Sequence, residues 1–446
     1  MEKINHFKIK KSMNREGDLL PQELIKFRKI EQVFRESCDQ FGYKEIKTST
    51  IEPFFLFTAT HVLTPELLER SYSFIDWESS KGERVSLRPD CTVSVCRYYL
   101  DYQENFPKKS KNEKFYYIET VYRLDQNESR TLQETWHFGI ENIGGKSPLS
   151  DVETIFIATE VLKKLDIPNY HLVLSYPKII IECIKLVFGE GQKKEVLDII
   201  NRKKTTNIRT IISQLNKIKQ HNQFFEIFTK LISYKGANAS YVKNLLSEFK
   251  LPESNLGLRE YINSIQEYLQ KFIDISTLLD KLNTSYEIDF ALSQEFEYYT
   301  GIHFHFLSDN GNILCSGGRY DSLLRNIGEN LQEDIPAVGM AFSAKEMFEI
   351  ISSEKPFPQL QNIGVVVQNL TLDNVQVGQK LCSKFNSLGF HTTILLTVPS
   401  RESMQNYGMV LEVDKELFEE GYNILFTQQI EKPFVQNLFG NNHINE

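Results

Sequence analysis

Charged and polar side chains interrupt an alternating apolar pattern in residues 117–145, and together they could form a binding site. Residues 117–124 and 132–141 alternate between apolar and polar side chains around a turn-forming stretch at 125–130, which predicts a β-hairpin. Arg123, His137 and Glu141 belong to these strands, where an unpaired buried charge costs several kcal/mol. Their presence indicates a polar cleft. A plain half-buried hairpin is the alternative.

Asp90 and Thr92 form a second candidate pair. The sequence Leu-Arg-Pro-Asp-Cys-Thr at 87–92 follows a strand-like stretch and precedes a predicted helix that runs through Val95 and Tyr98. Both side chains therefore lie at a helix start, where capping is the simplest role. A carboxylate beside a hydroxyl also suits an ammonium group, so ligand binding is the other interpretation.

Composition limits the class of protein. With 446 residues, 41% of them hydrophobic, the chain is long enough for two or three globular domains. Its apolar runs are far shorter than the roughly 18 residues of a membrane span, and its N-terminus lacks an apolar signal core, so we expect a cytoplasmic protein. The six cysteines have no C-x-x-C spacing, and we expect no metal, disulfide framework or cofactor. A net charge of -8 argues against nonspecific binding to polyanions.

Periodicity divides the rest of the chain. Apolar residues at helical spacing predict a helix after Pro21 that closes at Gly42, followed by a strand at 43–48. Residues 175–285 have helical periodicity with few Gly or Pro, whereas 286–306 contains two strand-like pieces around 295–301, and a turn with paired glycines follows at 311–321. A proline-containing linker at 352–361 precedes a strand, a helix and a second strand, which indicate a small α/β domain.

Several of these segments resemble the histidyl branch of the class II aminoacyl-tRNA synthetases. Arg123 with Phe-Gly-Ile-Glu at 138–141 resembles motif 2, and the first helix with its following strand resembles motif 1, the dimerisation segment, with Ser49 in place of a proline. Residues 87–92 resemble the element that holds the amino acid's ammonium group. Glu-Tyr-Tyr-Thr-Gly at 297–301 resembles the histidine signature, and 337–346 resembles motif 3.

The resemblance implies an α+β fold, in which helices flank a class II synthetase-like antiparallel sheet. It places the synthetase-like core at 1–174 and 286–352, a helical insertion at 175–285 and the small C-terminal α/β domain at 361–446. It also implies a histidine-binding pocket. The residues that match this pocket or lie beside its matching positions are Asp90, Thr92, Arg123, His137, Glu141, Tyr298 and Tyr299.

Two cationic positions of the family pattern are changed. Gln294 stands in the place of the signature arginine, and Glu346 stands in the place of the motif 3 arginine. In the family these arginines stabilise charge on ATP during activation, so we expect no synthetase catalysis and no catalytic residues here. A carboxylate about 4 Å from a phosphate is repelled by roughly 4 kcal/mol at an effective dielectric constant of about 20.

A pocket without its catalytic charges resembles the family of ATP phosphoribosyltransferase regulatory subunits. That resemblance implies a non-catalytic subunit of the first step of histidine biosynthesis, subject to feedback by free histidine. It also implies a homodimer within a hetero-oligomer that includes the short-form catalytic subunit. Residues 361–446 contain five Lys or Arg against nine Asp or Glu, so we expect no tRNA binding there. The alternatives are a divergent histidyl-tRNA synthetase and a ligand-free interaction module whose pocket His137 blocks.

Overall fold

The computed structural model describes residues 19–427, with some interruptions. Gln294, the hairpin turn at 125–130 and the linker at 352–361 lie outside the described residues. The interruptions are residues 20, 60–62, 78–81, 106–111, 125–131, 168, 202–206, 220–221, 249–255, 293–297, 329–330, 352–361, 368–370, 388–390, 401–406, 408 and 415–421.

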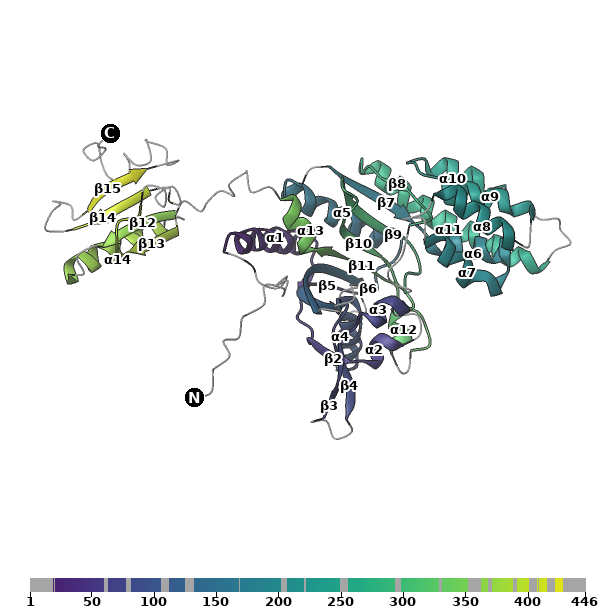
Figure 1. Cartoon of the computed structure of the whole chain (residues 1–446), viewed down its shortest axis with the longest axis horizontal. Coiled ribbons are helices and arrows are strands. Elements are labelled where there is room, and N and C mark those ends of the chain that lie inside the picture. Colours follow the sequence, from purple (N-terminus) through teal and green to yellow (C-terminus); the bar gives the residue numbers. More distant parts are fainter. Residues whose placement is uncertain are drawn as a thin grey trace, which may run out of the picture. The chain divides into compact units, whose positions relative to one another are not determined.

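The chain divides into two compact units, Met1–Ile351 and Ser352–Glu446. The first is built on an eight-stranded sheet whose neighbours are antiparallel, except for the parallel pairs β1–β5 and β7–β8 (Figure 1). In sheet order the strands are β1 (Lys44–Glu45), β5 (Glu113–Leu124), β6 (Leu132–Ile143), β11 (Ala337–Ser343), β10 (Ile313–Arg319), β9 (His303–Ser308), β7 (Tyr170–Ser175) and β8 (Glu287–Ile288). The predicted α+β class and the antiparallel sheet are confirmed.

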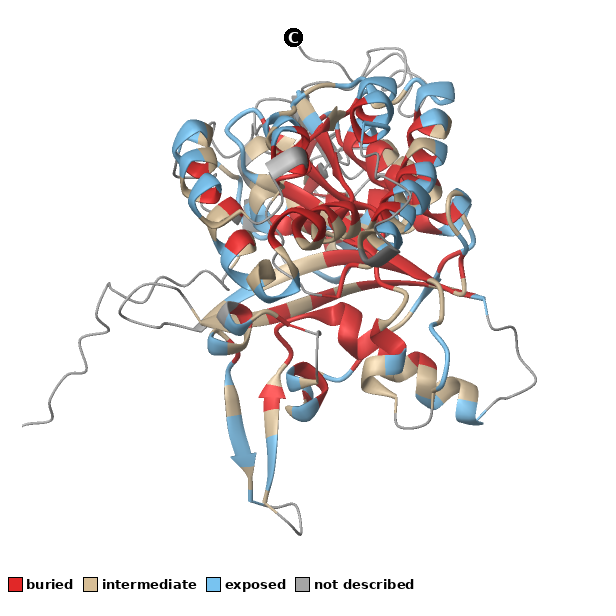
Figure 2. Ribbon diagram, turned by 90° about the vertical axis from the view of Figure 1, so that its right-hand side faces the viewer, coloured by how far each residue is buried: buried red, intermediate tan, exposed pale blue. Residues whose placement is uncertain are grey.

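Helices cover both faces of this sheet, and Figure 2 shows the buried residues concentrated between the layers. The helices α1 (Pro21–Gln40), α5 (Leu149–Lys164) and α13 (Ala344–Ile350) pack on one side, whereas α4 (Cys91–Asn105) and α12 (Leu323–Ile327) pack on the other. On the first side the ring of Phe34 meets the rings of Tyr116 and Phe138. Because strand side chains alternate, neighbouring Phe115 and Tyr117 face α4 instead.

The predicted first helix is confirmed as α1, whose buried Phe27, Ile30, Phe34 and Cys38 follow helical spacing. The chain leaves the helix through Gly42, whose φ of 74° is accessible to glycine without strain. The strand expected at 43–48 is much shorter, because only Lys44 and Glu45 pair with β5.

A small second sheet extends from the first unit. It has the order β2-β4-β3 and contains β2 (Ile51–Pro53), β3 (Ser73–Asp76) and β4 (Glu83–Leu87). Two short helices, α2 (Phe55–Thr58) and α3 (Pro65–Glu69), connect β2 to β3. At its other end β4 leads directly to Asp90 and the start of α4, so this sheet fixes where that helix begins.

Helices fill the chain between β7 and β8, as the periodicity predicts. They are α6 (Pro177–Phe188), the short 3₁₀ helix η1 (Glu190–Gln192), α7 (Lys193–Asn201), α8 (Ile208–Ile218), α9 (Asn222–Ser233), α10 (Ala239–Leu246) and α11 (Leu256–Lys281). The apolar face of α6 packs against α9 and α11, with the ring of Phe188 on Phe228 and Tyr176 beside Phe272.

The second unit has a four-stranded sheet in the order β13-β12-β14-β15. The predicted strand, helix and strand are confirmed as β12 (Asn362–Val367), α14 (Leu372–Ser387) and β13 (His391–Leu395). Two strands that the pattern did not predict, β14 (Met409–Val413) and β15 (Tyr422–Thr427), complete the sheet. Its core contains Ile363, Val365, Phe385 and Leu411.

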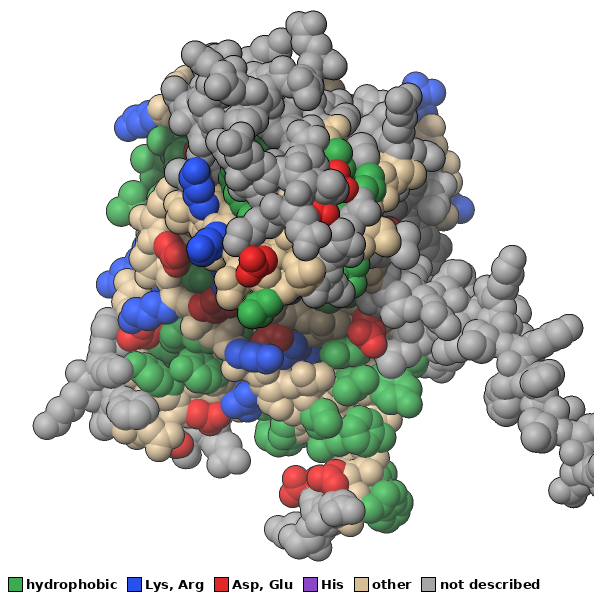
Figure 3. All heavy atoms as spheres, turned by 90° about the vertical axis from the view of Figure 1, so that its left-hand side faces the viewer, with side chains coloured by type: hydrophobic (Ala, Val, Ile, Leu, Met, Phe, Trp, Pro, Cys, Tyr) green, Lys and Arg blue, Asp and Glu red, His purple; other side chains and the backbone are tan. Residues whose placement is uncertain are grey.

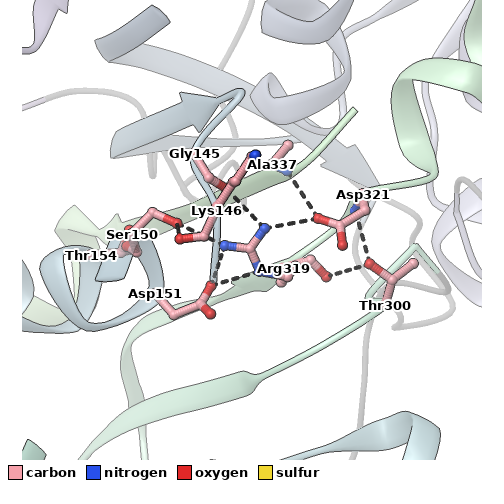
Figure 4. A network of polar contacts seen from close by, with 9 residues as sticks. All are labelled: Gly145, Lys146, Ser150, Asp151, Thr154, Thr300, Arg319, Asp321 and Ala337. Carbon is pink, nitrogen blue, oxygen red and sulfur yellow. Dashed lines mark hydrogen bonds and ion pairs between the residues drawn. The ribbon is translucent and has the colours of Figure 1, made fainter. Parts of the chain in front are cut away.

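A buried arginine joins the middle of the first sheet to α5 (Figure 4). The Arg319 side chain is only 4% exposed, and its Nε lies 2.8 Å from Oδ1 of the fully buried Asp151. The same guanidinium donates to the Ser150 hydroxyl at 2.8 Å and to the Asp321 carboxylate at 2.9 Å. The backbone N–H of Asp321 in turn donates to Oγ1 of Thr300. These bonds hold Thr300 against the end of β10.

Candidate functional site

A cavity of about 430 Å³ opens on the α4 side of the first sheet. Its size lies in the usual range for small-molecule sites. The register explains which β6 residues reach it, because Gln133, Thr135 and His137 alternate onto one face. Of the predicted residues, the cavity is lined by Asp90, Thr92, Arg123, His137, Tyr298 and Tyr299.

Asp90 and Thr92 lie at the start of α4, as expected. The Asp90 carboxylate accepts a hydrogen bond from the Val93 N–H at 3.0 Å and so caps α4. The same side chain also lines the cavity. Burial raises the pKa of Asp90 to about 6, against the opposing effects of the Val93 N–H and the Arg123 charge. A cationic group bound beside this carboxylate would favour its ionised form.

Glu141 forms the layer beneath the cavity rather than its lining. Its fully buried carboxyl accepts from the Thr92 hydroxyl at 2.7 Å through Oε1 and from the Tyr320 hydroxyl through Oε2. It lies across Gly339 of the neighbouring strand, and a Cβ at position 339 would overlap Oε2. Glu141 therefore reaches the cavity through Thr92 and Tyr320, both of which line it.

The environment of Glu141 favours its neutral form. Burial raises its pKa to about 8, and the nearby Asp90 carboxylate adds to the rise, although the hydroxyls of Tyr320 and Thr92 oppose it. The base of the cavity therefore presents hydrogen-bonding hydroxyls over a neutral carboxyl, which suits a neutral polar ring.

Arg123 and His137 lie on the sheet side of the cavity. The Nε of Arg123 donates to the Pro89 carbonyl oxygen at 2.9 Å, which fixes the guanidinium close to Asp90. Burial, and then the charges of Arg123 and Arg88, lower the pKa of His137 to about 3, so its imidazole is neutral. His137 forms part of the wall and leaves an open cavity, which weighs against a pocket blocked by this side chain.

Tyr298 and Tyr299 are buried and reach the cavity from the chain that precedes β9. Their ring centroids lie 5.0 Å apart, and the Tyr299 ring lies 4.6 Å from that of His303. Gly318 makes this packing possible, because a Cβ there would lie 2.7 Å from Tyr299. The predicted glycine pair thus allows close approach of an aromatic wall.

The structure adds residues that the pattern did not single out. Arg70, at the end of α3, lines the cavity and donates from Nε to the Leu124 carbonyl oxygen at 2.9 Å. His303 and His305 also line it; their two-residue spacing in the strand was a usable signal that both face one side. The residues next to Arg70 in the sequence give no sign that it belongs to the site. It is brought there by backbone pairing with the end of β5, a segment more than 50 residues away in the sequence.

Glu346 lines the cavity from α13. A carboxylate therefore lines the cavity at the position that matches the motif 3 arginine of the family pattern. Among the described residues, no group of three or more His, Cys, Asp or Glu side chains is arranged to hold a metal ion. Within the same part of the chain, no helix combines the length and apolarity needed to cross a membrane.

The antiparallel sheet, with its cavity on the α4 face, has the architecture of a class II synthetase-like protein. The histidyl-tRNA synthetase family profile matches residues 16–347.

Solved structures have the same fold. A Bacillus halodurans protein described as an ATP phosphoribosyltransferase regulatory subunit/histidyl-tRNA synthetase has a TM-score of 0.72 at 19% identity, covering 89% of this chain and 96% of that one. Histidyl-tRNA synthetase from Nostoc sp. PCC 7120 also has a TM-score of 0.72, at 18% identity, covering 92% and 93%.

Sequence relatives narrow the assignment. The ATP phosphoribosyltransferase regulatory subunit of Dehalococcoides mccartyi (strain CBDB1) is 34% identical over 77% of this chain and 78% of its own length. The histidine–tRNA ligase of Methanocaldococcus jannaschii is 29% identical over 73% of this chain and 72% of its own length. The chain belongs to the histidyl-tRNA synthetase family and, within it, to the ATP phosphoribosyltransferase regulatory subunits.

Proposed function

We propose that this chain is a non-catalytic regulatory subunit that assembles with the short-form catalytic subunit of ATP phosphoribosyltransferase in the first step of histidine biosynthesis. The main support for this proposal is the set of residues that line the cavity. Asp90, Thr92 and the two tyrosines offer polar contacts for an amino acid, while Glu346 brings negative charge to the same wall. Such a cavity favours sensing an amino acid over activating it with ATP.

Two features of the assembly belong to the same proposal. The chain forms a homodimer through α1 and the segment at 43–48 that follows it, the region that resembles motif 1. Its C-terminal unit does not bind tRNA, because five basic against nine acidic residues in 361–446 provide little counterion release.

Mixing the chain with a short-form ATP phosphoribosyltransferase catalytic subunit is expected to raise the rate of phosphoribosyl transfer. The measurement is initial rate against the concentration of this chain, with the catalytic subunit alone as the baseline. A saturating rise at a fixed stoichiometry supports the function. An unchanged rate, together with no co-sedimentation of the two chains, contradicts it.

We further propose that the cavity binds free histidine. The ammonium lies beside Asp90, and the imidazole lies above Thr92 and Tyr320, where Glu141 supports both hydroxyls. The carboxylate lies toward Arg123, whose guanidinium is fixed at Pro89. Binding is weak, because Gln294 supplies no charge where the family pattern has an arginine.

Asp90→Asn is expected to weaken histidine binding by about 10- to 100-fold, because a charge-assisted hydrogen bond contributes roughly 1.5–3 kcal/mol. Asparagine retains an oxygen for the Val93 N–H, so the cap on α4 is kept. Calorimetry measures the change. The control ligand is imidazole propionate, which lacks the ammonium group and should bind parent and variant equally. Equal loss for both ligands would place Asp90 away from the ammonium group.

A further inference from the structure

Backbone pairing brings Arg70 beside Arg123, at the end of the cavity where β5 leaves the sheet. Ser71 forms an isolated antiparallel bridge with Arg123, and the Leu124 N–H donates to the Arg70 carbonyl oxygen at 2.7 Å. In return, Nε of Arg70 donates to the Leu124 carbonyl oxygen at 2.9 Å. Both arginine side chains line the cavity, together with Gln133, the residue that pairs with Arg123 in the hairpin. Two guanidinium groups therefore lie at the same end of one small-molecule site.

The short helix α3 fixes the position of Arg70. Thr64 caps its N-terminus by accepting from the Leu67 N–H at 3.3 Å, and Arg70 terminates the helix with φ and ψ angles of -87° and -4°. Leu67 is 4% exposed and belongs to the same apolar cluster as Tyr298 and Tyr299, which line the cavity. Arg70 thus extends from an element that shares a core with the cavity wall, so little ordering is needed before it binds an anion.

Pairing of the two segments does not depend on a charged side chain at position 70. The bridge at Ser71 and the bond from the Leu124 N–H are formed by backbone atoms, which other residue types supply equally. Half-burial of the Arg70 guanidinium costs desolvation, and a bound anion offsets that loss. An arginine held at Nε points the edge formed by its two terminal nitrogens in another direction, and this edge matches the two oxygens of a carboxylate. The chemistry of Arg70 therefore suits an anionic group.

The charges that line the cavity match a zwitterion. Among the described residues, the lining contains two guanidiniums, from Arg70 and Arg123, and two carboxylates, from Asp90 and Glu346. On the face that Figure 3 draws, Lys and Arg side chains are mixed with Asp and Glu, and the whole chain carries a net charge of -8. Neither provides a broad positive field, so the selection of an anionic group depends on the local pair of arginines.

We propose that Arg70 is a specificity-determining residue for the carboxylate of histidine, which it holds together with Arg123. This inference rests on the proposed histidine binding and adds a residue to it. Gln294 provides no charge at the position of the signature arginine, and Arg70 supplies a cation from α3 instead. The ligand is thus bound by opposite charges at its two ends, by Asp90 at the ammonium group and by the arginine pair at the carboxylate.

The test is calorimetry of the full chain with histidine and with histidinamide, in which a neutral amide replaces the carboxylate. Arg70→Met should weaken histidine binding by about 10-fold, the lower end for a charge-assisted hydrogen bond, because Arg70 is only half-buried. Histidinamide should bind the variant no more weakly than the parent, whereas a merely structural role of Arg70 would weaken both ligands. Arg84→Met is the matched control, because Arg84 is exposed on β4 and lies outside the cavity lining. It should leave the affinity for both ligands unchanged.

Arg70→Lys is a second measurement that keeps the charge. Lysine cannot present the paired nitrogens of a guanidinium, so this variant should bind histidine with an affinity between those of the parent and Arg70→Met, and histidinamide as the parent does. Circular dichroism verifies that the variants are folded. Equal weakening of both ligands, or an unchanged affinity for histidine in Arg70→Met, overturns the role of Arg70 and leaves histidine binding itself intact. A parent that binds no histidine overturns both, and the transfer-rate assay tests the regulatory function separately.

Discussion

The purified chain is expected to show no histidine-dependent exchange of pyrophosphate into ATP. By the resemblance to the synthetases, three arginines stabilise the charge that develops on ATP, and the sequence match assigns Gln294 and Glu346 to two of their positions. Loss of one preorganised stabilising group costs about 2.7–4 kcal/mol, or 100- to 1,000-fold in rate. Two such losses reduce the rate by roughly 10⁴-fold or more. Glu346 lines the cavity, so its negative charge adds repulsion.

One feature acts against this loss. Arg70 lines the same cavity and brings a further cation to it. Its Nε is bonded to the Leu124 carbonyl oxygen near the end of β5, which fixes it on the Arg123 side, whereas Glu346 enters from α13. A single cation at Arg70 replaces at most one of the two changed arginines, so the expected net effect remains a loss.

Pyrophosphate exchange with radiolabel measures this directly. The double variant Gln294→Arg with Glu346→Arg should raise exchange above the parent, because it restores both cations. Glu104→Arg, an exposed substitution on α4 with the same charge change as Glu346→Arg, is the control and should have no effect. Robust exchange by the unmodified chain would make it a histidine–tRNA ligase and reject the non-catalytic function.

Arg319→Met is expected to reduce the free energy of unfolding by about 3–5 kcal/mol, because it leaves the buried Asp151 carboxylate without its counterion. It also removes the hydrogen bonds that Arg319 donates to Ser150 and the Gly145 carbonyl oxygen. Chemical denaturation followed by circular dichroism measures the difference. Adding Asp151→Asn should recover part of the loss, since the orphaned charge disappears.

The chain offers a matched pair at the surface. Arg325 lies 3.1 Å from Asp334, and both side chains are nearly half exposed. Arg325→Met should change stability by less than about 1 kcal/mol, because solvent screens an exposed ion pair. Similar losses for Arg319→Met and Arg325→Met would show that burial does not set the value of the Arg319 network.

Local patterns predicted the parts of the fold that depend on neighbours in sequence. The spacing of Phe27, Ile30 and Phe34 identified α1, and the alternation around 117–141 identified the hairpin of β5 and β6. The cap position of Asp90 was also visible in its local sequence. By contrast, β14 depends on pairing with β12 and β15 depends on pairing with β14, and their own residues give only a weak signal for this.

The sequence predicted which residues belong to the candidate site better than it predicted how they are arranged. The side chains of Asp90, Thr92 and Tyr299 do line one cavity, although they come from distant segments. The position of Glu141 beneath it depends on Gly339, a residue of another strand, and on the Tyr320 hydroxyl. The arrival of Arg70 depends on its backbone bond with Leu124, a long-range contact. No periodicity within one segment records such contacts.

The position of Glu141 has a mechanical consequence. Its two oxygens tie Thr92, in the first turn of α4, to Tyr320, which lies just before α12 and is 228 residues further along the chain. The absence of a side chain at Gly339 makes the room that this carboxyl occupies beside β11. A molecule that contacts the hydroxyl of Thr92 or of Tyr320 is therefore coupled, through Glu141, both to the start of α4 and to the segment just before α12.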